Sequence, residues 1–86
     1  MGTFDDQRLL EIFLYGLTAG VSPQDCATIR RKLVIFRAIR SWTTVGIVGE
    51  VFLVEGGRLA VMATDDWGIS FEWWEGQGAS MMRLEP

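Results

Sequence analysis

Residues 68–74 read Gly68-Ile69-Ser70-Phe71-Glu72-Trp73-Trp74, a stretch in which apolar and polar side chains alternate. Side chains of a β-strand point alternately to its two faces, so Ile69, Phe71 and Trp73 share one face. Ser70, Glu72 and Trp74 share the other. The pattern predicts a half-buried strand whose Phe71 face lies in the core.

Strands are also predicted on both sides of this stretch. Residues 58–63 follow the glycine pair Gly56-Gly57, which favours a tight hairpin turn. Residues 79–84 follow a second turn at Gly76-Gln77-Gly78. Neighbouring strands joined by such short turns pair antiparallel, so we expect a meander.

The segment after Trp42 has the composition of a strand. Residues 44–48 and 50–54 are rich in β-branched side chains, so we expect extended structure in both. Gly46 and Gly49 interrupt them and predict a bulge or a kink. Trp42 itself is expected to pack where the helices join the sheet.

The beginning of the chain predicts an amphipathic helix over about residues 4–15. Leu9, Ile12 and Phe13 have the three- and four-residue spacing of one helix face. Gly16 stands where such a helix ends.

A second helix is predicted from Ser22 to about Ile39. Ser22 is a capping residue, Pro23 suits the first helical position, and Asp25 places negative charge in the first turn. Its buried stripe would contain Cys26, Ile29, Leu33 and Phe36. The element order predicts a single α+β domain over residues 1–86, with two N-terminal helices packed on one face of an antiparallel sheet.

Composition narrows the functions open to the chain. Its 86 residues are 49% apolar, carry a formal net charge of −3 and include one cysteine and no histidine. The commonest general base and any cysteine-cluster metal site are therefore excluded, and we expect no cofactor and no metal. No apolar run reaches the roughly 18–20 residues that span a bilayer, and residues 1–6 do not form a signal peptide. These features predict a soluble, cytoplasmic protein.

Two groups of residues resemble the HigB-type toxins of the RelE/ParE superfamily. Residues 12–13, 16–21 and 24–33 are similar to that family's short helix, its "G-x-T-x-G-V" loop and its longer helix. Residues 57–61 and 66–73 fall where the family has "G-x-W-S-I" and "N/Q-W-R-I-x-F-x-[FW]". The resemblance covers most of the chain and implies a RelE/HigB-like domain.

The same resemblance implies a ribosome-dependent mRNA endonuclease held by an antitoxin, but the family's catalytic groups are missing at the matching positions. The family's lysine falls near Glu55, two of its arginines fall at Thr64 and Gly68, and its C-terminal "D-Y-H" falls at residues 83–86. RNA cleavage needs a group that takes the 2′-hydroxyl proton, a group that protonates the leaving oxygen, and cations that stabilise the phosphorane. We therefore expect no catalytic residues and no ribosome-dependent cleavage of mRNA.

The candidate partner-binding residues lie on and around the strand at residues 68–74. Trp74 and Glu72 share the face opposite the core, while Asp65, Asp66 and Glu75 lie in the turns at the two ends of that strand. An exposed tryptophan among carboxylates suits a basic partner, because the ring supplies contact area and the acids steer the encounter. The alternative is that these acids are only solvated.

A second candidate surface is basic. Arg30, Arg31, Arg37 and Arg40 lie in a stretch of the second helix and its end that contains no acid. Such a cluster can bind nucleic acid or an acidic antitoxin, and it can equally be a solvated helix face.

The preferred interpretation is a non-catalytic inhibitor or regulator that binds a protein through a HigB/RelE-like scaffold. Small acidic phage and mobile-element proteins of the anti-CRISPR and antirestriction type disable nucleic-acid machinery in this way. Its partner would be a basic or nucleic-acid-binding protein rather than RNA, the ribosome or a membrane. The alternative is a divergent HigB-like mRNA endonuclease with an antitoxin partner. The missing histidine argues against that alternative, and so does the small number of cations on the expected face, where only Arg58 and Arg83 are left. The basic second helix argues for it.

Overall fold

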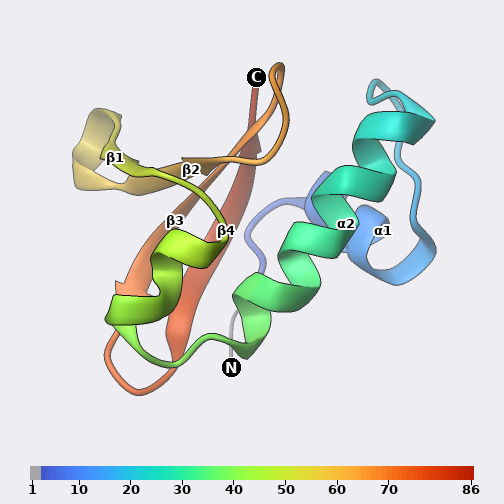
Figure 1. Ribbon diagram of the computed structural model, residues 1–86. Helices are drawn as coiled ribbons and strands as arrows, with labels where there is room; N and C mark the ends of the chain where they lie inside the picture. Colours follow the sequence, from blue (N-terminus) through green and yellow to red (C-terminus); the bar gives the residue numbers. More distant parts are fainter. Residues whose placement is uncertain (1–2) are drawn as a thin grey trace.

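The computed structural model describes residues 3–86 and contains two helices followed by a four-stranded sheet (Figure 1). The helices are α1 (Gln7–Tyr15) and α2 (Pro23–Ala38). The strands, in sheet order, are β1 (Val51–Leu53), β2 (Leu59–Met62), β3 (Gly68–Trp74) and β4 (Gly78–Glu85). Each strand pairs antiparallel with the next, so the predicted α+β class and meander are confirmed.

The helix ends follow the predicted local signals. The Ser22 side chain accepts a hydrogen bond of 3.1 Å from the Asp25 N–H, and Pro23 is the first residue of α2. Gly16 ends α1 with φ of 80°, a left-handed conformation that glycine adopts without steric cost.

The first helix begins later than predicted, because residues 3–6 pair with the edge of the sheet instead. Phe4 forms a parallel bridge with Met82 of β4, and the Asp5 N–H donates to the Met82 carbonyl oxygen at 2.9 Å. Asp6 then caps α1 by accepting from the Arg8 N–H at 2.9 Å and also accepts from the Leu84 N–H at 3.0 Å. This segment therefore covers the outer edge of β4.

The extended structure predicted for residues 44–48 is wrong, since a 3-10 helix occupies Trp42–Ile47. A 3-10 helix has three residues per turn, so Val45 and Val48 fall on one side, where both are buried. The Thr44 N–H and hydroxyl both donate to the Ser41 carbonyl oxygen and stabilise the first turn. Burial of the two valines against the sheet thus overrides their β-propensity.

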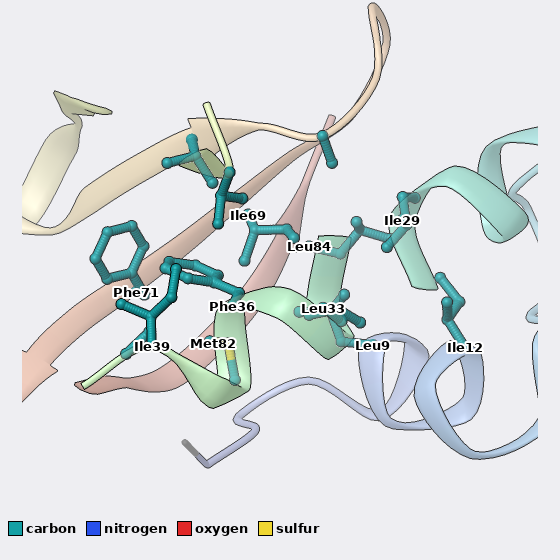
Figure 2. Packing of buried hydrophobic residues seen from close by; sticks show 14 of the residues in the cluster. Leu9, Ile12, Ile29, Leu33, Phe36, Ile39, Ile69, Phe71, Met82 and Leu84 are labelled. Atoms are coloured by element: carbon teal, nitrogen blue, oxygen red, sulfur yellow. The ribbon is translucent and has the colours of Figure 1, made fainter. Parts of the chain in front are cut away.

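The core lies between the helices and the inner face of the sheet, where α1 and α2 pack against each other and both contact β4 (Figures 1 and 2). The rings of Phe36 on α2 and Phe71 on β3 meet edge to face, with centroids 4.8 Å apart at 89°. Of the residues expected in the core, Phe13 and Trp73 are partly buried, and those fully buried are Leu9, Ile29, Leu33, Phe36, Val61, Ile69 and Phe71.

The turn between β3 and β4 closes against the end of α2. Gly78 has φ of 86°, and any side chain there would collide with the Ile39 carbonyl group. Beside this turn the ring of Trp42 packs edge-on against Trp73, with centroids 5.2 Å apart. Trp42 therefore packs at the junction of helix and sheet as expected, although 47% of it is exposed.

Replacement of Phe71 by alanine tests the central packing contact. We expect Phe71→Ala to lower the free energy of unfolding by about 3–5 kcal/mol, because it removes a fully buried ring and leaves a cavity beside Phe36. Phe52→Ala is the matched control, because Phe52 is half exposed on β1, and it should cost about 1 kcal/mol or less. Urea denaturation followed by circular dichroism measures both, and equal losses would contradict this strand register.

The pH dependence of stability tests the Asp6 contacts. Partial burial disfavours the charged form of Asp6, but the hydrogen bonds from the Leu84 N–H and from Arg8 outweigh it and lower the pKa of the carboxyl. A lowered pKa stabilises the fold above the unfolded-state value of about 4, and this contribution is lost as pH falls through the folded-state pKa. Asp6→Asn should therefore cost about 1 kcal/mol at pH 7 and less at pH 3. A cost that is the same at both pH values, in parallel urea titrations, would contradict the assignment.

Candidate protein-binding surfaces

The outer face of the sheet, which points away from the helices, is polar around β3 and β4, and Phe52 of β1 and Met62 of β2 are exposed on the same face. It contains the side chains of Arg58, Ser70, Glu72, Trp74, Arg83 and Glu85. Ser70 is buried on this face because its neighbours fold over it: its hydroxyl donates to Glu85 Oε1 at 2.8 Å, and Arg58 Nε donates to the same hydroxyl oxygen at 3.4 Å. The face is therefore a connected hydrogen-bond network.

Arg58 lies at the centre of this network. Its Nη1 atom is 3.5 Å from Glu72 Oε2, and its Nη2 atom donates to the Met81 carbonyl oxygen. Met81 sits in a bulge of β4 with φ of 52°, in the register shift opposite the Ser70–Glu72 stretch of β3. The Arg58 side chain is 13% exposed, so the guanidinium is held against the sheet rather than presented to solvent.

The other arginines near this face are also paired with acids. Arg83 Nη2 is 2.6 Å from Asp5 Oδ2, and Arg8 Nη2 is 3.3 Å from Asp6 Oδ2. Together with Arg58 and Glu72, these are the three ion pairs within residues 3–86. Each cation on this side of the molecule is thus neutralised by a carboxylate of the same chain.

Trp74 is the exposed aromatic side chain that β3 places on the outer face, and Phe52 of β1 is exposed on the same face. Trp74 is 39% exposed, and its indole N–H donates to Glu72 Oε1 at 3.0 Å. Glu72 therefore uses one carboxylate oxygen for Trp74 and the other for Arg58. The ring is held in one orientation with part of its apolar surface open, which is the arrangement of an interface anchor.

The remaining acids proposed for this surface lie at the two ends of β3. Glu75 is exposed in the turn directly after Trp74. Asp65 and Asp66 are exposed in the turn before β3, where the Thr64 hydroxyl accepts from the Asp66 N–H at 3.2 Å. The structure thus brings Glu72, Trp74 and Glu75 together and leaves the aspartate pair at the far end of the strand.

The four arginines of the predicted basic surface do not lie together in the structure. The Arg37 guanidinium carbon lies 4.6 Å from the Phe13 ring centroid and 5.5 Å from that of Phe4, so it packs with the N-terminal segment. Arg30 and Arg31 lie on another side of α2, where both line a hollow. Arg40 is exposed beyond the helix end.

A surface that sequence reasoning missed lies around this hollow. Val34 and Ile35 are exposed on α2, and Tyr15 and Leu17 are exposed beside Gly16 at the end of α1. The signal was present in the sequence, because α2 has apolar residues on both sides: one stripe is buried, and Val34 and Ile35 fall outside it.

Metal and nucleophilic chemistry find no support in the described part of the chain. Residues 3–86 contain no group of three histidine, cysteine, aspartate or glutamate side chains that could hold a metal ion. Cys26 is fully buried on α2, with its Sγ atom 3.7 Å from the Val21 carbonyl oxygen, as a small core residue would be. None of the helices in this part of the chain is long and apolar enough to cross a membrane.

No protein-family model matches the chain, and no curated protein matches it either.

Proposed function

We propose that the protein is a non-catalytic binding module that inhibits or regulates a basic, nucleic-acid-binding protein through the outer face of its sheet. The observation that carries this proposal is the pairing of Arg58 with Glu72 and of Arg83 with Asp5. A surface that grips phosphate needs uncompensated cations, because binding is driven by the release of counterions from the nucleic acid. Here the available cations are already neutralised.

The groups that RNA cleavage requires are also engaged elsewhere or missing. The chain has no histidine, and its single lysine, Lys32, lies on α2 and donates to the Met62 carbonyl oxygen at 3.4 Å. Glu85, in the C-terminal stretch where the resembling toxins have "D-Y-H", accepts the Ser70 hydroxyl. The endonuclease alternative would need a proton acceptor and free cations on one face. These contacts argue against it.

Trp74 and the acids at the two ends of β3 would bind the partner. The half-exposed indole offers apolar contact area at low entropic cost, because its orientation is already fixed by Glu72. Glu75 is exposed in the turn directly after Trp74, so an arginine or lysine of a partner can pair with it as the ring is covered. Asp65 and Asp66 extend the negative charge to the far end of β3 and favour encounter with a basic surface.

Affinity capture with matched baits tests this function. The protein, Trp74→Ala and Tyr15→Ala are immobilised in parallel, and bound host proteins are quantified by mass spectrometry at two ionic strengths. We expect the parent bait to enrich a basic partner and Trp74→Ala to lose it, because truncating an interface anchor costs about 2 kcal/mol or more. Tyr15→Ala removes an exposed aromatic ring from the end of α1, away from the outer face, and should keep the partner.

The kinetics of the captured complex separate the anchor from the steering charges. In surface plasmon resonance, Trp74→Ala should speed dissociation, whereas Asp65→Lys combined with Asp66→Lys should mainly slow association, and more so at low salt. Circular dichroism checks that each variant is folded. Folded variants that bind as tightly as the parent at both salts would remove the outer face from the interface.

A further inference from the structure

The surface formed by α2 and the end of α1, here called the helical surface, has a hollow of about 760 Å³. Its lining comes from one face of α2 together with Gly16: Gln24, Ala27, Thr28, Arg30, Arg31, Val34 and Ile35. This face is separate from the outer face of the sheet, because α2 turns its opposite side toward β4 and the core.

The helical surface exposes more apolar area than a solvated helix needs. Val34 is 55% exposed and Ile35 is 45% exposed, although both are β-branched residues that favour neither a helix nor water. Tyr15 and Leu17, on either side of Gly16 in the chain, are exposed as well. Val34 and Ile35 line the hollow, and exposed apolar side chains that line a hollow mark a binding site more often than a solvated surface does.

The charge of this surface is positive and uncompensated. Arg30 and Arg31 line the hollow, no acid lines it, and neither arginine forms an ion pair with any of residues 3–86. Arg30 Nε donates to the Phe13 carbonyl oxygen at 3.1 Å, which holds that side chain across the gap between the two helices. The contrast with Arg8, Arg58 and Arg83, which are all paired, indicates that the counter-charge for this surface comes from another molecule.

The shape of the surface favours a helix as the occupant. The backbone groups of α2 are used within the helix, so a partner cannot add a strand here and must bind through side chains. A helix presents anchors at intervals of three and four residues, which suits the row that runs along α2 from Ala27 through Val34.

A second copy of the chain fits this surface poorly. The helix α1 contains one acid, Glu11, whose Oε1 atom accepts from the Thr18 hydroxyl at 2.6 Å, and α2 contains one acid, Asp25, in its first turn. Neither helix can offer a row of carboxylates to Arg30 and Arg31. A second copy therefore has no helix with the charge pattern that this surface requires.

We propose that the helical surface binds an amphipathic helix of a partner protein that has a row of carboxylates along one flank of its apolar stripe. The apolar stripe packs on Val34 and Ile35, and the carboxylates pair with Arg30 and Arg31. This site lies on residues that the outer face does not use, so the protein would have two binding surfaces of opposite charge.

Selection from a displayed library of helical peptides tests the proposal. The library keeps a leucine stripe at helical spacing and randomises the flanking positions among glutamate, lysine, glutamine and serine, and the folded parent protein is the target. We expect enrichment of peptides with glutamate along one flank. An absence of enrichment, or enrichment of peptides without glutamate bias, would overturn the proposal.

Binding of the enriched peptides to matched variants locates the site. In fluorescence anisotropy, Arg30→Glu with Arg31→Glu, and separately Val34→Ser, should each weaken binding at least tenfold. Trp74→Ala and Phe52→Ser should leave it unchanged, and this distinguishes the helical surface from the outer face. Undiminished binding to the Arg30/Arg31 variant would overturn the proposal. So would a dimer of the parent protein in sedimentation that Val34→Ser dissociates, because the occupant would then be a second copy.

Discussion

The contact between Phe36 of α2 and Phe71 of β3 sets the orientation of everything else in the sheet. Because Phe71 points into the core, the alternation of a strand turns Ser70 and Glu72 to the outer face. The antiparallel register then places Arg83 of β4 opposite Ser70, and the bulge at Met81 turns a carbonyl oxygen toward Arg58. A one-residue shift in strand register would exchange the side chains of the two faces and break the hydrogen bonds of the polar network.

The polar network has a functional consequence, because it determines which charges remain available to a ligand. On the outer face the arginines are engaged with carboxylates, and the apolar side chains of Phe52, Met62 and Trp74 remain exposed. On the helical surface Arg30 and Arg31 are without carboxylate partners among the described residues. Two surfaces of one small domain thus differ in which sign of charge they can still bind, and this difference supports protein recognition on both.

Much of this fold follows from local sequence signals. The capping residues Ser22 and Gly16 and the alternation over residues 68–74 act within a few residues, so they could be predicted without a structure. The 3-10 helix at Trp42–Ile47 could not, because its stability comes from burying Val45 and Val48 against the sheet.

The candidate surfaces were predictable only in part. The alternation places Glu72 and Trp74 on one face, which the structure confirms. The pairing of Arg83 with Asp5 joins residues that are 78 positions apart, and no local pattern reveals such a partner. The exposure of Val34 and Ile35 was not predicted for a different reason: apolar residues in a helix are ordinarily assigned to the core.

The neutralisation of the outer-face arginines is the central claim, and RNA binding measures it most directly. A fluorescently labelled single-stranded RNA is titrated with the parent protein and with the double variant Asp5→Asn, Glu72→Gln, which removes the negative charges that face Arg83 and Arg58 while keeping the side-chain shapes. Fluorescence anisotropy at low and at physiological ionic strength follows binding. The account predicts no saturable binding by the parent and a gain of salt-sensitive binding by the variant. Binding by the parent that is as tight and as salt-sensitive as that of the variant would contradict it.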